Sequence, residues 1–157
     1  MRKKIIAALW VLTGCFLLQS CKKDKAEDKP ATPPPATSKW QVNSSGYTAT
    51  STIWVSKDVS MGVPGLMAKD AASKAQIVVG FKTKPTTSGQ YPVFVGNYAN
   101  DLQSTQAGIE IFDGVGTWYH ANKGTVSVTV TNGKLKIDLS NVSDYQNTKL
   151  TGSLVEQ

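Results

Sequence analysis

Residues 125–140 read TVSVTVTNGKLKIDLS, and this stretch determines the expected fold class. Valines alternate with Thr and Ser in its first half, and Leu or Ile alternates with polar residues in its second half. Such alternation indicates two β-strands, each with one buried face. Asn132-Gly133 between them suits a two-residue type I′ turn, in which both residues need positive φ. Pairing Thr131 with Lys134 puts all six apolar side chains on one face, so the stretch predicts an antiparallel hairpin.

Weaker alternation recurs between clusters of Gly, Asn, Pro and Ser outside this hairpin, without a long 3.6-residue period. We therefore predict an all-β domain over residues 39–157, an antiparallel β-sandwich or flattened barrel of about eight strands. Residues 56–74 give no clear strand pattern, and residues 68–75 could form a helical turn. The other expected strands cover residues 40–42, 47–55, 75–82, 91–95, 106–112, 117–120 and 148–155.

Alternation also assigns side chains to the faces of these strands. In residues 106–112, Ile109 and Ile111 share a face, so Glu110 between them is expected to point to solvent. In residues 47–55, Trp54 falls on the face opposite its two neighbours. The other face of that strand would carry Tyr47, Ala49, Ile53 and Val55.

The N-terminus carries the pattern of an export signal. Three basic residues at positions 2–4 precede an apolar run over residues 5–18, which is shorter than the roughly 20 residues of a transmembrane helix. The run ends in Leu18-Gln19-Ser20-Cys21, with a small residue directly before the Cys. This ending resembles the lipobox of bacterial lipoproteins.

The lipobox resemblance implies that residues 1–20 are a signal peptide that is removed, with Leu18 and Ser20 recognised by the signal peptidase. It also implies that Cys21 carries lipid; the other interpretation is an ordinary secretory signal with a chance Cys. Because Cys15 leaves with the signal, the exported domain would have no free thiol and no disulfide. At about 0.8 kcal/mol per buried methylene, two or three acyl chains would hold the protein to a membrane.

Residues 21–38 are expected to form a disordered tether, because charged residues and four prolines leave nothing to build a core. The charged, acid-containing start of this segment resembles that of Bacteroidota lipoproteins, in which such a stretch can direct export to the cell surface. Lys22 stands where enterobacterial lipoproteins retained in the inner membrane have Asp. We expect a lipid anchor in the outer membrane, on its surface or its periplasmic side.

Short motifs in the domain resemble a group of uncharacterised Bacteroidota lipoprotein domains. The resemblance implies an exported, β-sandwich-like domain of unknown function, and it transfers no functional residues. The motifs are Tyr47-Thr48-Ala49, Gly89-Gln90-Tyr91, Tyr119 with Gly124-Thr125-Val126, and Leu150-Thr151-Gly152-Ser153.

The charge distribution gives no sign of a nucleic-acid partner. The chain has 17 basic and 11 acidic residues, but residues 39–157 hold only 10 Lys and eight acids, and Arg2 is the one Arg of the sequence. Specific nucleic-acid readers rely on Arg and on clustered basic patches. We therefore exclude nucleic-acid binding.

The sequence contains few residues of the types that catalytic and metal sites require. His120 is the only histidine, and the sequence has no Gly-x-Ser-x-Gly motif. With one His and no free Cys, an ordinary zinc site lacks ligands, so we expect no metal and no cofactor. Paired carboxylates of a small glycoside hydrolase are the remaining catalytic option. The candidates are Glu110, Asp113, Asp138 and Asp144, although strand faces and turns account for each of them.

The aromatic residues offer two interpretations: core packing, or a platform on which a sugar stacks. The candidate ligand platform is Trp54, Trp118 and Tyr119, and Trp40 and Tyr98 are further members of the set. The leading hypothesis is a non-enzymatic, lipid-anchored β-domain of the cell envelope that serves as a binding or accessory module, with a glycan or an envelope protein as the expected partner. The alternative is a carbohydrate-binding module that assists glycan uptake, and a small hydrolase comes third.

Overall fold

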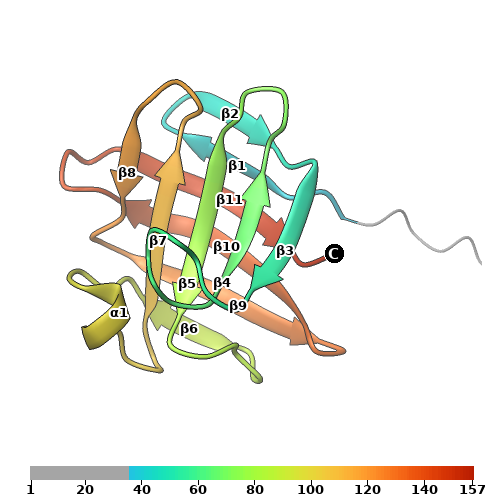
Figure 1. Cartoon of the computed structure of the whole chain (residues 1–157), viewed down its shortest axis with the longest axis vertical. Helices are drawn as coiled ribbons and strands as arrows, with labels where there is room; N and C mark the ends of the chain where they lie inside the picture. Colours follow the sequence, from blue (N-terminus) through green and yellow to red (C-terminus); the bar gives the residue numbers. More distant parts are fainter. Residues whose placement is uncertain (1–35) are drawn as a thin grey trace, which may run out of the picture. The chain divides into compact units, whose positions relative to one another are not determined.

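The computed structural model describes residues 36–157, which form two antiparallel sheets packed face to face and one short helix, α1 (Tyr98–Asp101) (Figure 1). These residues form no closed barrel, and of the two predicted architectures the β-sandwich is confirmed. The first sheet runs β2 (Ser45–Thr48), β1 (Lys39–Val42), β11 (Lys149–Val155), β10 (Lys134–Ser143), β9 (Thr125–Thr131) and β6 (Gly89–Pro92). The second runs β3 (Ser51–Val55), β4 (Gly65–Lys69), β5 (Gln76–Phe81), β7 (Ala107–Phe112) and β8 (Trp118–His120).

The β9–β10 hairpin has the predicted register. Thr131 lies opposite Lys134, and Val128 lies opposite Ile137. Asn132 and Gly133 have φ of 52° and 75°, the left-handed values that a type I′ turn requires. The apolar face of the hairpin therefore points into the space between the sheets, where Ile137 is fully buried.

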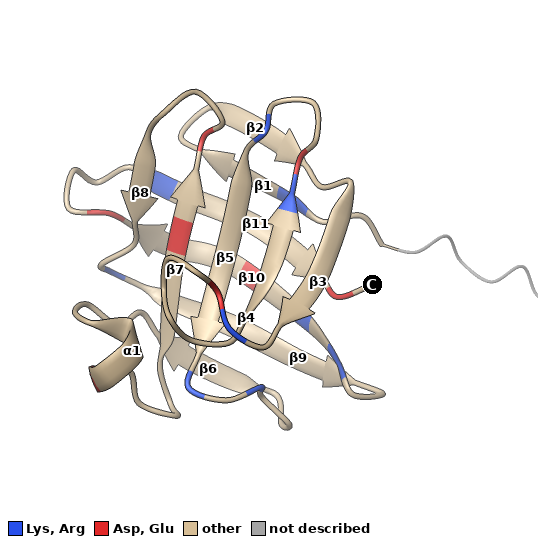
Figure 2. Ribbon diagram, in the orientation of Figure 1, with Lys and Arg blue, Asp and Glu red and all other residues tan. Residues whose placement is uncertain are grey.

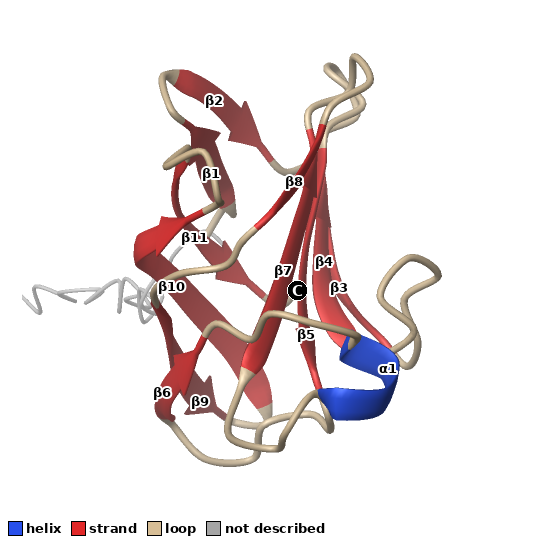
Figure 3. Cartoon of the chain, turned by 90° about the vertical axis from the view of Figure 1, so that its left-hand side faces the viewer, coloured by secondary structure: helices blue, strands red, loops and turns tan. Residues whose placement is uncertain are grey.

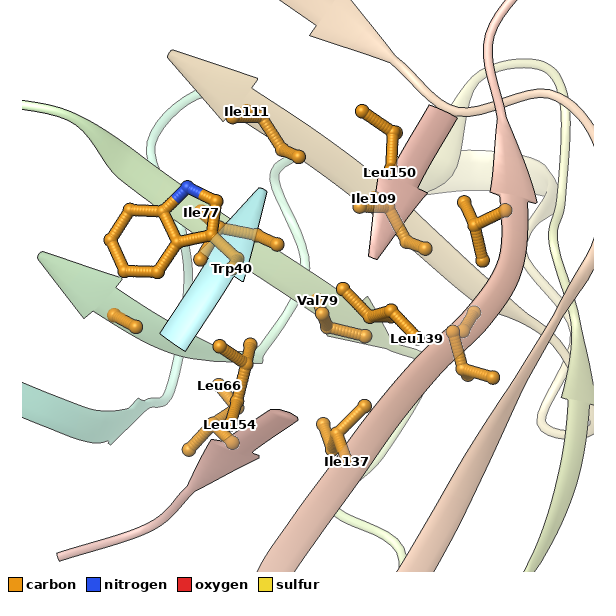
Figure 4. Close-up of a cluster of buried hydrophobic side chains, with 14 of the residues drawn as sticks. Trp40, Leu66, Ile77, Val79, Ile109, Ile111, Ile137, Leu139, Leu150 and Leu154 are labelled. Carbon is orange, nitrogen blue, oxygen red and sulfur yellow. The ribbon is translucent and has the colours of Figure 1, made fainter. Parts of the chain in front are cut away.

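The main core fills the space between the two sheets (Figure 4). The hairpin and β11 contribute from one side, and β5 and β7 contribute Ile77, Val79, Ile109 and Ile111 from the other. Trp40 is buried at one end of this core, with its ring centroid 5.4 Å from that of Tyr47. Because all of this core comes from residues 40–154, residues 36–157 are expected to fold on their own.

The predicted strand over residues 47–55 is wrong, because the chain changes sheets in its middle. It leaves the first sheet after Thr48 and joins the second at Ser51. The crossing shifts the phase of the alternation, so that Trp54 faces the core and Ile53 is 49% exposed. Similarly, the strand expected over residues 91–95 ends at Pro92, and the chain then crosses toward β7.

Residues 56–74, which had no assignment, contain strand β4. Its Leu66 and Ala68 are fully buried in the main core. The helical turn expected over residues 68–75 is therefore wrong at its start, since the strand continues to Lys69. A turn follows instead, in which Asp70 Oδ1 accepts a hydrogen bond of 2.9 Å from the amide of Ala72.

The domain begins at Ser38, which is completely buried, so the predicted tether over residues 21–38 is wrong at this last residue. Its Oγ accepts hydrogen bonds from the amide of Val155 (2.7 Å) and from Thr52 Oγ1 (2.8 Å). The predicted signal peptide, the lipobox residues Leu18, Ser20 and Cys21, and the tether up to residue 35 lie outside the described residues. Within residues 36–157, no helix is long and apolar enough to cross a membrane.

Candidate functional site

The outer face of the second sheet is covered by the loop over residues 56–64 and the segment around α1, which together we call the cover. A small cluster of Met61, Val63, Val78 and Leu102 lies there, separate from the main core. Its members come from β5, from the loop over residues 56–64 and from the segment around α1. Figure 3 shows α1 against the outside of this sheet, away from the other sheet.

Two facing glycines make room for this cover. Gly80 of β5 lies opposite Gly108 of β7. A Cβ on Gly108 would come within 2.5 Å of Met61 Cε and 2.6 Å of Tyr98 Cε1, and a Cβ on Gly80 would come within 2.8 Å of Met61 Cε. The sheet is therefore hollowed at this point, and the side chains of the loop and the helix fit into the hollow.

Asp58, itself buried, holds the covering loop in shape. Its Oδ1 accepts hydrogen bonds from the Ser60 amide (3.0 Å), the Ser60 hydroxyl (2.6 Å) and the Met61 amide (3.0 Å). Its own amide donates to the carbonyl of Val63, 2.8 Å away. This network fixes the segment that precedes Met61 without help from a ligand.

An open pocket of about 610 Å³ lies beside this cover, between the loop, the start of α1 and strands β7 and β8. Glu110, His120 and Tyr98 are among its lining residues. Three exposed apolar side chains also line it: Val59 (99% exposed), Val95 (46%) and Tyr145 (71%). Their contact with water is energetically unfavourable. The pocket thus combines a polar pair on the sheet with an apolar rim.

Glu110 does not point into solvent as predicted: it is only 5% exposed. Alternation correctly places it opposite Ile109 and Ile111, but the cover lies over that outer face. Figure 2 marks an acidic position within β7, and Glu110 is the acid of that strand. A carboxylate here is surrounded by protein rather than by bulk water.

The two oxygens of Glu110 differ in their surroundings. Oε1 lies 3.4 Å from Nδ1 of His120, the residue opposite it on β8. Oε2 is buried and has no hydrogen-bond partner among the described residues. Burial, assisted by the negative charge of Glu110, raises the pKa of Tyr98 to about 12.

The other acids weighed as catalytic partners do not join Glu110 in this pocket. Asp113 Oδ1 accepts from the amides of Val115 and Thr117 in the β7–β8 turn. Asp138 pairs with Lys136 at 3.0 Å on β10, and Asp144 accepts from the amides of a turn that precedes β11. Within residues 36–157, no group of three or more His, Cys, Asp or Glu could hold a metal ion.

The aromatic residues of the candidate platform do not share one surface. Trp54 lies on edge strand β3, faces the core and stacks on Phe81 at 6.3 Å. Trp118 lies on the opposite edge strand, β8, where it is 46% exposed and 5.1 Å from the ring of Phe112. Tyr119, between Trp118 and His120, packs against the main core. Trp40 is in the core as well, whereas Tyr98 lines the pocket.

Sequence reasoning missed the apolar rim of the pocket. Val59 lies in a segment without a strand pattern, Val95 lies at the end of the strand expected over residues 91–95, and Tyr145 lies in a turn after β10. The isolated Val59 in the polar stretch Lys57-Asp58-Val59-Ser60 gives no signal by itself, because single exposed apolar residues are common on protein surfaces.

Comparison with known proteins gives no relative for this chain: no family model, no curated protein and no solved structure matches it. Functional residues therefore cannot be transferred from another protein. The geometry and chemistry of the pocket have to support a function on their own.

Proposed function

We propose that this chain is a lipid-anchored protein of the bacterial cell envelope whose β-sandwich binds a small organic ligand in the Glu110 pocket and catalyses no reaction. The observation that carries the proposal is the buried, unpartnered Oε2 of Glu110 in a pocket with an exposed apolar rim. Export and anchoring are inferred from Leu18-Gln19-Ser20-Cys21, with the outer membrane as the expected site.

Two unfavourable features of the pocket support binding. A buried carboxylate oxygen without a partner lacks the hydrogen bonds that water would supply. Val59 and Tyr145 expose apolar surface to water, and its burial under a ligand would be favourable. A ligand with a hydrogen-bond donor and an apolar body would relieve both costs at once, which is the pattern of a small-molecule site.

A binding role fits the pocket better than hydrolysis does. Glycoside hydrolases use two carboxyl groups that flank the scissile bond. Among the described residues that line this pocket, Glu110 is the single acid. A ligand would therefore meet one carboxylate and an apolar wall.

NMR mapping tests the binding site directly. Residues 36–157, labelled with ¹⁵N, would be titrated with small phenyl-substituted alcohols, amines and carboxylates. We expect saturable shifts at the pocket amides of Gly62, Gly96 and Ala121. Val59→Thr should weaken binding, whereas Val115→Thr, an equally conservative change of an exposed Val outside the pocket, should not. Shifts centred elsewhere, or none with any compound, would contradict the proposal.

The anchor is tested separately on the full chain. Cys21→Ala should move the protein from the membrane fraction to the soluble fraction and abolish incorporation of labelled palmitate. Continued labelling of the variant would refute the lipobox assignment. Cys15→Ala is the matched control, because Cys15 is expected to leave with the signal peptide.

A carbohydrate-binding role is the second candidate, and the exposed Trp118 on Phe112 favours it. Sugar rings stack on exposed aromatic side chains, and this pair lies on the outer face next to the Glu110–His120 pair. Oligosaccharide titrations followed by tryptophan fluorescence would test it. Loss of the response in Trp118→Ala, but not in Trp54→Phe, would support a glycan site on β8.

A further inference from the structure

We infer that the Glu110 pocket selects organic ammonium ligands, that is, primary amines attached to an apolar body. The inference rests on the proposed function and names the chemical class of its ligand. It follows from the charge, the hydrogen-bonding state and the apolar surface of the described residues that line the pocket.

The charge of the pocket favours a cation. Glu110 supplies the one carboxylate, and no Lys or Arg is among the described lining residues. His120 lies at Oε1, whereas Oε2 has no partner among the described residues and is shielded from water, so a ligand donor reaches it by displacing part of what covers it. A charge-assisted hydrogen bond from an ammonium group to Oε2 would be stronger than one from a neutral donor, particularly where water is excluded.

The apolar parts of the pocket suit the remainder of such a ligand. Val59 and Val95 can pack against its hydrocarbon body, and both are exposed without it. The rings of Tyr98 and Tyr145 line the same pocket, and aromatic faces attract cations.

Other ligand classes fit these features less well. An anion would meet the Glu110 carboxylate with no cationic Lys or Arg among the described lining residues to compensate. A neutral alcohol could donate to Oε2 but would lack the attraction between two opposite charges. A hard metal ion needs several oxygen ligands, and Glu110 is the lone carboxylate of the described lining.

Three compounds of nearly the same shape separate these classes: 2-phenylethylammonium, 2-phenylethanol and 3-phenylpropionate. Each would be titrated into ¹⁵N-labelled residues 36–157, with shifts followed at Gly62, Gly96 and Ala121. We expect the ammonium compound to bind at least about tenfold more tightly than the alcohol, from the usual strength of hydrogen bonds to charged groups. The carboxylate should bind most weakly.

Glu110→Gln keeps the shape of the side chain and removes its charge. It should weaken binding of the ammonium compound by at least about tenfold and leave the alcohol within about twofold. Asp138→Asn is the matched control, because it makes the same change of net charge on β10, outside the pocket lining. That control should bind like the wild type.

The outcomes distinguish this inference from the proposed function. If the alcohol or the carboxylate binds in the pocket as tightly as the ammonium compound, the pocket binds ligands but the ammonium inference is wrong. Equal effects of Glu110→Gln on ammonium and alcohol would also refute it. If none of the three compounds shifts the pocket amides, the proposed binding function fails together with the inference.

Discussion

The two faces of the second sheet are covered in different ways. Its inner face meets the first sheet over a large core whose members come mostly from regular strands. Its outer face is covered by one loop and one turn of helix, over a cluster of four buried side chains. The inner face holds the domain together, whereas the outer face leaves room for a pocket and a buried carboxylate. A face with little packing can accommodate a binding site that the main core could not tolerate.

Truncation of the inner core should have the largest effect. Ile137→Ala removes a fully buried side chain from the centre of the hairpin and should lower the free energy of unfolding by about 2–5 kcal/mol. Met61→Ala in the smaller outer cluster should cost less, about 2 kcal/mol, at the low end of the same range. Urea denaturation followed by tryptophan fluorescence measures both values. Equal losses would show that the outer cover is as important to stability as the core.

Filling the hollow in the sheet should come next. Gly108→Ala places a methyl group against Met61 and Tyr98 and should cost about 1–3 kcal/mol, because overpacking shifts neighbouring groups. It should also displace the cover and abolish ligand shifts in the pocket. Gly46→Ala on β2 is the control, since the nearest neighbour of a Cβ there is a flexible Gln41 side-chain atom 3.8 Å away. A stable Gly108→Ala variant with normal binding would contradict the role given to this glycine.

Removing the buried acid should stabilise the domain. Glu110→Leu replaces a desolvated carboxylate with an apolar side chain of similar size and should raise the free energy of unfolding by about 1 kcal/mol. Glu156→Leu should do the opposite, because Glu156 pairs with Lys84 at 2.6 Å and accepts from the Leu135 amide at 3.0 Å. A loss of stability in Glu110→Leu would mean that this acid has a structural role instead.

The smallest effect at neutral pH concerns Tyr98. Its pKa is about 12 in the folded domain and about 10 in an unfolded chain, so the folded state favours the neutral phenol. The stability from this group is complete below pH 10 and is lost as the pH rises toward 12. A spectrophotometric titration at 295 nm should show a late-titrating tyrosine that Tyr98→Phe removes. Its titration near pH 10 would indicate that the outer cover is open.

Sequence reasoning succeeded where one face of a strand is apolar and the other polar. The hairpin met that condition, and so its register could be read directly from Val128, Ile137 and the Asn132-Gly133 turn. It failed for β4 because Met67 on its outer side is also partly buried, which removes the contrast between the faces. For Glu110 the face was correct, but no local pattern reveals that residues far along the chain cover it.

The pocket could not be predicted for the same reason. Val59, Tyr98 and Tyr145 come from three separate segments, and only the fold brings them to Glu110. The lipobox lies at the other extreme, because Leu18, Ser20 and Cys21 form a local motif that needs no fold to be recognised. That motif predicts a cellular location, whereas the ligand-binding site is formed by residues that are far apart in the sequence.

The burial of Ser38 has a mechanical consequence. Strand β1 begins directly after it and is bonded to β2 on one side and β11 on the other. A pull along the strand at Ser38 would load both ladders and the hydrogen bond to Val155 together, in shear, rather than open them one after another. A domain held by its N-terminus in flowing surroundings would therefore resist unzipping from the end at which it is held.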